Sequence, residues 1–376
     1  CSQGNAGQIT PGHLPLPQPG TIGRNLGWAL RSTSPLYIRP RWDVGLFNWL
    51  WQFTRACNHQ QMRQATQILG QLGRASLELF EQLASDSSFS YQRSGRLEVC
   101  RTQRALLAVQ QEAALLRALG FTSRLLSGGE VHELEPAVTG TVAGGVYYPL
   151  SAHCNPQRLV TQMAAAAEAL GVEFRPNTCV TDVCVRSHRV AGVETDGQKI
   201  EADVVVLACG SWSPALARRV GVRLPIQPGK GYHLDIDRPA QCPRVPLVLV
   251  EERIFVTPID DFLRLAGTME FSGFNLELNP TRLDLLVAGS SRYLSGLDRA
   301  GRRSEWCHLR PMTPDGLPVI GRIPGAGNLW IATGHGMLGL TQGPVTGKMI
   351  AESITTGEAS LDLTTLRPDR FSRPVA

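Results

Sequence analysis

The feature that most constrains the fold is an apolar strand, a glycine-rich loop and a long helix in direct succession near the end of the 376-residue chain. Residues 328–334 (NLWIATG) have the apolar character of a buried strand. Three glycines lie within 334–339, and residues 343–355 have the pattern of a helix that begins at Gly343 with Pro344 in its first position. Because such units build parallel sheets, the sequence predicts an α/β or mixed α+β fold.

A second segment predicts the neighbouring part of the same sheet. Residues 203–209 (DVVVLAC) are almost all apolar, with a run of β-branched valines, which is typical of a strand buried on both faces. Ligands of open α/β sheets bind outside the carboxyl ends of the strands, so we expect a ligand near residues 209–212. The alternative is a plain helix cap made by Ser211 or Ser213.

The rest of the chain has a simpler pattern. Residues 1–40 are expected to be loop, 46–83 to be helical and 172–177 to be a strand. Short apolar runs separated by Pro and Gly between 225 and 268 indicate an antiparallel meander. Because the chain exceeds the size of one ordinary core, we expect two interleaved domains.

Composition excludes some classes of function. The net charge of +5 is only mildly basic and no Lys/Arg run is present, so nucleic acid is not an expected partner. An anionic substrate, a phosphate-bearing cofactor or a membrane surface fits this charge better. The nine cysteines are scattered without a C-x-x-C pair, which predicts reduced thiols in the cytoplasm and no metal site.

The most aromatic segment is LFNWLWQF at residues 46–53. Trp49 and Trp51 could lie at a membrane interface, but we favour a helix that packs in the core or between domains. No apolar run reaches the roughly 20 residues needed to cross a bilayer.

Arg310 directly precedes P-M-T-P-D-G, in which P-D-G is a turn signature. We expect the turn to hold the guanidinium at the end of a strand. A guanidinium suits a carboxylate because its planar fork donates two parallel hydrogen bonds, although a structural salt bridge is the alternative. The separation of 25 residues lets His335 face the same cavity.

The glycine-rich loop and its helix predict the other half of a site. Glycines let the backbone pass close to a planar ring, and a helix N-terminus carries about half a positive charge. Such a terminus at Gly343 suits the electron-rich edge of a flat cofactor such as a reduced flavin, unless this is an ordinary βα turn. Together with Arg310, the pattern indicates an enzyme that oxidises amino-acid-like substrates.

Five motifs occur in the order found in one family. They are NAGQITPG (5–12), ACGSWS (208–213), GKGYHLDI (229–236), LRPMTPDGLPVIGR (309–322) and NLWIATGHGMLGLTQGPVTGK (328–348). Over essentially its whole length the chain resembles the family of D-amino acid dehydrogenase small subunits. This family lies within the wider FAD-dependent group of D-amino acid oxidase, glycine oxidase and sarcosine oxidase.

The resemblance implies a FAD-binding domain of glutathione-reductase-like fold and a substrate domain with a mainly antiparallel sheet. The former would take residues 1–36, 151–215 and 310–376, and the latter 37–150 and 216–309. The family opens with a strand, G-x-G-x-x-G and a helix that hold the FAD pyrophosphate. No such segment occurs in this sequence. We therefore expect an incomplete FAD-binding domain with weak or absent FAD binding, through truncation or because another polypeptide supplies the missing part.

The resemblance also implies roles for individual residues. Arg310 would bind the substrate carboxylate, with Tyr232 and His335 as further catalytic-site residues, and Phe255 loosely matches an active-site tyrosine of glycine oxidases. The residues implied to contact FAD are Ser2, Asn5, Ala6, Gly7, Gln8, Val180, Cys209, Gly210, Trp212, Gly334, Gly336, Met337, Leu338, Gly339 and Leu340.

The implied reaction is oxidative deamination of D-amino acids to 2-oxo acids and ammonia, by hydride transfer to flavin N5, with electrons passed to a quinone-type acceptor. Alternatives are an amino or imino acid oxidase, a hydroxyproline dehydrogenase subunit, and a non-catalytic, partner-dependent subunit. The resemblance leaves open a second subunit. It also leaves open peripheral attachment of this cytoplasmic protein to the cytoplasmic face of the bacterial inner membrane.

Overall fold

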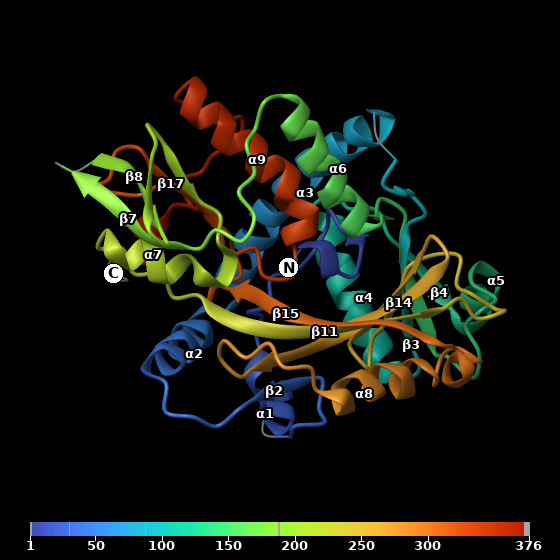
Figure 1. Ribbon diagram of the computed structural model, residues 1–376. Coiled ribbons are helices and arrows are strands. Elements are labelled where there is room, and N and C mark those ends of the chain that lie inside the picture. Colours follow the sequence, from blue (N-terminus) through green and yellow to red (C-terminus); the bar gives the residue numbers. More distant parts are fainter. Residues whose placement is uncertain (1, 30, 87, 187–188, 372–376) are drawn as a thin grey trace.

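A nine-stranded sheet is the largest layer of the molecule (Figure 1). The computed structural model describes residues 2–29, 31–86, 88–186 and 189–371. In spatial order the sheet contains β15 (Arg302–Met312), β11 (Gln227–Asp237), β14 (Phe262–Phe271), β13 (Ile254–Ile259), β12 (Leu247–Leu249), β3 (Arg96–Cys100), β5 (Gly144–Tyr148) and β4 (Arg124–Ser127), with β2 (Leu36–Ile38) paired to β14. Only the β12–β3 and β14–β2 pairs are parallel. The predicted antiparallel meander is confirmed for β12, β13 and β14, whereas β11 pairs with β14 instead of β12.

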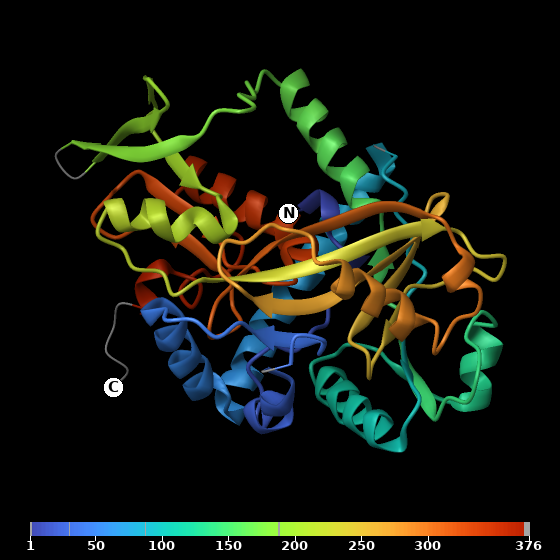
Figure 2. The ribbon, with the colours of Figure 1, turned by 60° about the horizontal axis from the view of Figure 1, so that its bottom comes forward.

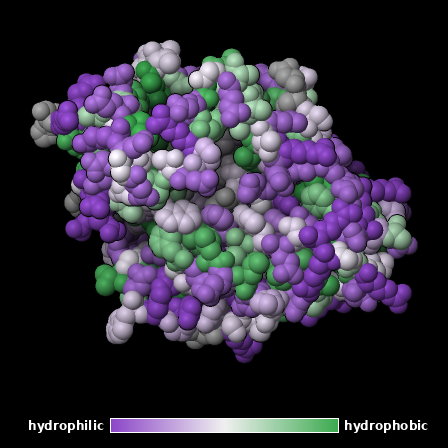
Figure 3. Space-filling view, in the orientation of Figure 1, coloured by the Kyte–Doolittle hydropathy of each residue, from purple (hydrophilic) through white to green (hydrophobic). Residues whose placement is uncertain are grey.

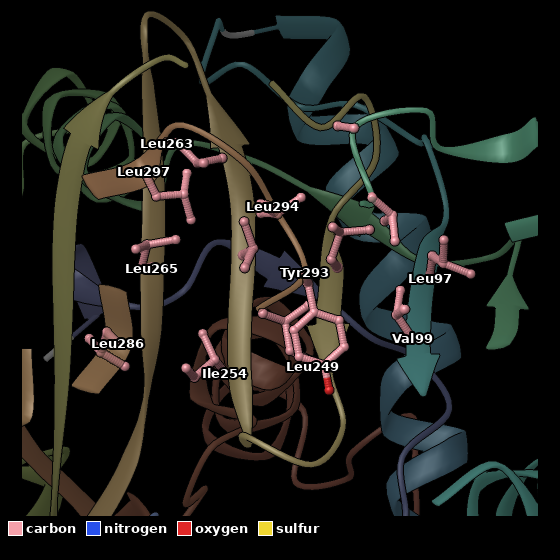
Figure 4. Close-up of a cluster of buried hydrophobic side chains, with 14 of the residues drawn as sticks. Leu97, Val99, Leu249, Ile254, Leu263, Leu265, Leu286, Tyr293, Leu294 and Leu297 are labelled. Atoms are coloured by element: carbon pink, nitrogen blue, oxygen red, sulfur yellow. The ribbon is translucent and has the colours of Figure 1, made fainter. Parts of the chain in front are cut away.

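One face of this sheet is covered by α8 (Pro280–Ser290) and by the chain that follows it (Figure 4). Asn279 caps the helix by accepting a hydrogen bond from the Thr281 N–H, and Pro280 lies in its first turn. The residues that interlock there include Leu286, Tyr293, Leu294 and Leu297 with Ile254, Leu263 and Leu265. Each fully buried leucine contributes about 1.5–3 kcal/mol, so this cluster holds the central strands in register.

The other face of the sheet carries the N-terminal segment. Here η1 (Ser2–Gly4) leads into β1 (Gln8–Ile9), which pairs antiparallel with β6 (Ala152–His153). The Nδ1 atom of His233 lies 2.8 Å from the Gly4 carbonyl oxygen. Contacts of this kind hold the segment against the sheet, so its backbone can form one wall of a site.

The predicted strand–loop–helix is confirmed, and it belongs to a second sheet. This sheet contains β10 (Val205–Leu207), β17 (Leu329–Thr333) and β16 (Val319–Arg322), with β10 parallel to β17. Helices α3 (His59–Asp86) and α9 (Gly339–Thr355) pack on one face, and α7 (Ser213–Arg219) packs on the other. Together with the large sheet this gives the predicted mixed α/β fold.

The start of α9 differs from the prediction. The helix begins at Gly339, one turn before Gly343, and Pro344 lies inside it. The first N–H groups of any helix lack intrahelical partners, so a proline this close to the start removes little beyond the bond to the Leu340 carbonyl oxygen. Pro344 therefore does not mark the first helical position.

The helical pattern over 46–83 is confirmed as two helices, α2 (Val44–Ala56) and α3, because Asn58 accepts a hydrogen bond from the Gln61 N–H and starts a new helix. Three other predictions are wrong. Helix α1 (Thr21–Ala29) lies within the predicted loop, and residues 172–177 form no strand. Strand β10 is not buried on both faces, since Val206 is 38% exposed and borders a cavity.

Smaller elements complete the chain. They are α4 (Gln103–Ala118), α5 (Gly128–Leu134), α6 (Pro156–Ala169), β7 (Val180–Arg186), β8 (Arg189–Thr195), β9 (Gln198–Glu201) and the short turns η2 (Gly210–Trp212), η3 (Leu297–Arg299) and η4 (Pro368–Phe371). Figures 1 and 2 show α6 and the β7–β8 hairpin on the side of α9, away from α1 and α2. The domain boundaries stay a prediction.

Candidate active site

A cavity of about 630 Å³ lies between the large sheet, the N-terminal segment, the end of β10 and the start of α9. Its walls are mostly glycine, aromatic and aliphatic residues. Of the described side chains that line it, Arg310 alone is charged at neutral pH. The described side chains therefore give the cavity one cation in a low-dielectric surrounding, which favours a ligand with an anionic group.

Arg310 lies on β15, opposite Gly229 of β11. Its Nη1 atom donates to the Thr268 carbonyl oxygen at 2.8 Å and approaches the Met269 sulfur at 3.8 Å. Burial lowers the pKa of Arg310 to about 10, and no acidic group in the described part of the chain raises it back. A half-buried guanidinium without a carboxylate partner still has donors available for an incoming one.

Gly231 gives the Arg310 guanidinium its space. A Cβ atom on Gly231 would lie 2.2 Å from Cζ of Arg310, and a Cβ on Gly229 would lie 2.6 Å from the sulfur of Met269. The two glycines of G-K-G are two residues apart, so they lie on the same face of β11. The motif G-K-G therefore leaves this face of β11 without side chains at two positions, so that a large side chain can cross the strand.

Tyr232 lies on the opposite face of the sheet from Arg310. Its ring packs in the cluster beneath α8, and its hydroxyl donates to Oε2 of Glu270 at 3.0 Å. Burial, followed by the Glu270 charge, raises the pKa of Tyr232. Tyr232 borders the cavity, but its hydroxyl is not brought beside Arg310. The position of the Tyr232 hydroxyl does not support a catalytic role, which stays a prediction.

His335 lines the same cavity as Arg310. Its Nε2 atom lies 2.9 Å from the Thr346 hydroxyl of α9, and its backbone forms an isolated bridge with Met312, two residues after Arg310. Burial lowers the pKa of His335 to about 4, so the ring is neutral at physiological pH. His335 therefore contributes a polar contact, but no charge, to this wall.

The N-terminal segment supplies the next wall, where Ser2, Asn5, Ala6 and Gln8 border the cavity. The Nε2 atom of Gln8 donates to the Leu247 carbonyl oxygen at 3.2 Å and to the Thr257 hydroxyl at 3.1 Å, which anchors the segment to the sheet. Gly7 lies behind the wall and has φ +82°, and a Cβ there would lie 2.6 Å from the Cys154 carbonyl oxygen. Gly7 thus shapes the turn instead of lining the cavity.

The glycine-rich loop and the start of α9 form the wall opposite. Gly336, Met337, Leu338, Gly339 and Leu340 border the cavity, while Gly334 lies just outside it. The N-cap residue Leu338 makes no side-chain cap bond. The N–H groups of the first turn and their partial positive charge are therefore available to an electron-rich group.

The end of β10 closes the cavity with Cys209, Gly210 and Trp212. Val180, at the start of β7, is not among the residues that border it. Most of the predicted cofactor residues are thus brought to one cavity, and Val180, Gly7 and Gly334 are the exceptions. Their implied contacts with a cofactor stay predictions.

Sequence reasoning missed an aromatic row beside Arg310. Trp306 stacks on His233 and on His308, with ring centroids 5.1 Å and 5.4 Å apart, and the His308 ring meets Trp212 at 5.8 Å. Residues 306, 308 and 310 alternate along β15, so their side chains share one face. The pattern W-x-H-x-R was visible in the sequence and could have predicted this wall.

Comparison with known proteins gives a consistent result. The model of the FAD dependent oxidoreductase family matches residues 1–353. A D-amino acid dehydrogenase of Paramagnetospirillum magneticum is 32% identical over 377 residues, which are 98% of this chain and 89% of that protein. One of Cereibacter sphaeroides is 34% identical over 386 residues, with 98% and 88% covered.

Solved structures share the fold. A glycine oxidase from Geobacillus kaustophilus superposes with a TM-score of 0.76 at 24% identity, over 80% of this chain and 83% of that one. The L-proline dehydrogenase from P. horikoshii gives 0.75 at 21% identity, over 84% and 86%.

Proposed function

This chain belongs to the FAD dependent oxidoreductase family, and on that premise we propose that it oxidises D-amino acids to 2-oxo acids and ammonia. In this proposal a quinone-type acceptor takes the electrons. The observation that carries it is Arg310, a half-buried cation without a carboxylate partner, whereas the other described side chains that line its cavity carry no charge. The names of the curated relatives support the choice of a D-amino acid and of a dehydrogenase.

The cavity fits the flavin ring of FAD, the cofactor of the family, and the weak FAD binding expected of this chain stays a prediction. Gly210, Gly343 and Gly347 border it, and a Cβ on any of them would meet no atom within 4 Å. Bare backbone next to open space is the surface on which a flat ring system can lie. The uncapped start of α9 would hold the electron-rich edge of the ring, and the N-terminal segment would hold the opposite edge.

Bound FAD would supply the two-electron chemistry by accepting a hydride from the substrate Cα at flavin N5. The chain's own residues would orient the substrate. Arg310 binds the carboxylate with its two-donor fork and so places Cα toward the ring. The amino group must be neutral so that its nitrogen can form the C=N bond of the imine as the hydride leaves Cα. The low-dielectric cavity favours this deprotonated form. Water then hydrolyses the imine to the 2-oxo acid and ammonia.

The direct test is anaerobic reduction of the FAD-loaded chain. We expect D-alanine to bleach the flavin absorbance and L-alanine to leave it, with reoxidation by a quinone faster than by O2. Bleaching by the L-isomer alone would contradict the assignment to D-amino acids. Fast reoxidation by O2 would instead identify an oxidase.

The proposal includes a place for the acceptor. A quinone dissolved in lipid requires the enzyme to bind at a membrane surface, and we place it at the cytoplasmic face of the bacterial inner membrane. Within the described ranges, no helix is long and apolar enough to cross a bilayer. A second subunit belongs to the same proposal only if the acceptor proves to be a protein.

A further inference from the structure

Helix α2 and the residue before its cap present an apolar stripe to solvent. Trp42 is 96% exposed, Val44 84%, Trp51 57% and Phe47 49%. Val44, Phe47 and Trp51 are spaced i, i+3 and i+7, so they lie along one side of the helix. The Trp42 ring meets the Phe47 ring edge-on at 5.8 Å, which makes the stripe continuous.

The opposite side of α2 is also apolar and is already in use. Leu46, Trp49 and Phe53 are buried, with the same spacing, against Met269, Phe271 and Met312 of the sheet. Packing in the core therefore explains only half of the apolar residues of this helix. The outward half has no such explanation, and large exposed aromatic side chains in a row mark interaction surfaces.

The charged side chains of the segment that carries the stripe, residues 39–55, are three arginines and one acidic residue, Asp43. Asp43 is paired with Arg41 at 2.8 Å. Arg39 and Arg55 are exposed at either end of the stripe, and the Arg55 guanidinium lies over the Trp51 ring at 4.8 Å.

We propose that this stripe, Trp42, Val44, Phe47 and Trp51 with Arg39 and Arg55, is a docking surface for an anionic lipid bilayer. Tryptophan and phenylalanine enter the interfacial layer of a bilayer, while arginine pairs with anionic headgroups. A second copy of the chain fits less well, because a two-fold contact would place the same arginines face to face. The α2 helix would lie flat on the membrane with its other side still packed on the sheet.

The surface is directly coupled to the cavity. The indole N–H of Trp49 donates to the Met312 carbonyl oxygen at 2.8 Å, and a Cβ on Gly336 in the cavity wall would lie 3.4 Å from the Met312 methyl group. Helix α2 and the side chains packed beneath it, Trp49 and Met312, thus connect the proposed lipid contact to the candidate active site. On the proposed function, this arrangement brings a lipid-dissolved quinone close to the reduced cofactor.

Apolar side chains also gather over β11, β15 and the loop before α8 (Figure 3). Phe274 of this loop is exposed, and the loop starts beside the stripe, because Arg41 Nη1 donates to the Phe271 carbonyl oxygen at 2.7 Å. Phe274 also meets Trp212 of the cavity wall at 5.6 Å. The loop therefore extends the apolar surface from α2 toward the cavity.

Flotation with lipid vesicles tests the proposal without requiring enzyme activity. We expect the purified chain to float with phosphatidylcholine vesicles that contain phosphatidylglycerol, and to bind pure phosphatidylcholine several-fold more weakly. The variant W42S/F47S/W51S should partition about tenfold less or weaker still. The variant R39E/R55E should lose at least roughly fivefold per arginine, and only on anionic vesicles.

The matched control is L107S/L125S, which removes exposed leucines from α4 and β4 and should leave flotation unchanged. The triple variant should keep full activity with a soluble dye and lose it with quinone in vesicles. No flotation of the wild-type chain, or equal loss in the control, would overturn the proposal. A dimer in sedimentation velocity that the triple variant dissolves would assign the stripe to a second copy instead.

The two proposals fail separately. Flotation without D-amino acid oxidation would contradict the proposed function alone. Oxidation with a dye but without flotation would contradict the docking surface alone.

Discussion

The large sheet holds Arg264 and Arg310 in opposite ways, with Arg264 buried and Arg310 half-buried beside the cavity. Arg264 donates to both carboxylate oxygens of Asp235, at 2.7 Å and 2.8 Å, and to the Asn5 carbonyl oxygen at 2.7 Å. Arg310 contacts a carbonyl oxygen and a thioether, and no carboxylate in the described residues approaches it. One guanidinium has its counter-charge built in, and the other borders a cavity.

The difference separates a structural role from a binding role. Desolvation of a charged group costs free energy that an ion pair offsets within the fold. At Arg310 only an external anion can offset it. Charged side chains without a partner in the fold are found where a ligand supplies the opposite charge. We therefore assign Arg310, and not Arg264, to the substrate.

The largest expected effect concerns the paired arginine, Arg264. The variant R264L leaves the buried Asp235 carboxylate with only the His233 ring, at 3.8 Å, beside it, so we expect the free energy of unfolding to fall by about 3–5 kcal/mol. Urea denaturation followed by circular dichroism measures this change. If the free energy of unfolding fell by less than about 1 kcal/mol, the Arg264–Asp235 pair would behave as an exposed ion pair and not as a buried one.

The unpaired arginine should respond in the opposite way. We expect R310L to unfold at the same urea concentration as the wild-type chain, or higher, because it removes a desolvated charge that nothing in the fold offsets. Its KM for the substrate should rise by roughly 30- to 1000-fold, or about 2–4 kcal/mol. Paired urea titrations and steady-state kinetics on the same preparations separate the two effects.

A smaller effect is expected when Gly231, which leaves room for the Arg310 side chain, is replaced. In G231A the new methyl group would collide with the guanidinium of Arg310. We expect KM to rise about tenfold, with an overpacking cost of about 1–3 kcal/mol in stability. The control G129A, where a Cβ meets no atom within 4 Å, should change neither quantity. Equal kinetics in both variants would mean that Arg310 has room to move.

Buried neutral histidines give the smallest effect. Burial lowers the pKa of His153 from 6.5 to about 4. Between these pH values the unfolded chain binds the proton and the folded chain does not, so stability falls as the pH drops from 6.5 to 4. The slope per histidine is at most about 1.4 kcal/mol per pH unit. In H153Q the slope of unfolding free energy against pH should decrease by up to this amount, and an unchanged slope would show that His153 titrates normally.

The sequence predicts well where chemistry and local pattern coincide. The strand–loop–helix at the C-terminal end needed only apolar periodicity and glycines, and Arg310 and residues 335–339 of the glycine-rich loop border one cavity. The sequence predicts the start of α9 one turn too late, because Pro344 resembles a proline in the first position of a helix. Near the start of a helix a proline is tolerated at several positions, so it does not determine the boundary.

Other features depend on packing that no local pattern reveals. Strand β11 is buried on both faces, so alternation along it could not tell which face Tyr232 would take, and the hydroxyl was assigned to the site. The role of Gly231 depends on a side chain 79 residues away in the sequence. The segment 46–53 was expected to pack inside, which is correct for Trp49 but wrong for Trp51.

The most direct test of the central claim is whether Arg310 recognises the substrate carboxylate. The rate of anaerobic flavin reduction can be measured with D-alanine and with its amide, D-alaninamide, in the FAD-loaded wild-type chain and in R310L. We predict that the wild-type chain prefers the carboxylate by roughly 30- to 1000-fold in kcat/KM and that R310L shows almost no preference. If R310L kept the wild-type preference, Arg310 would not be the carboxylate anchor and the account would fail.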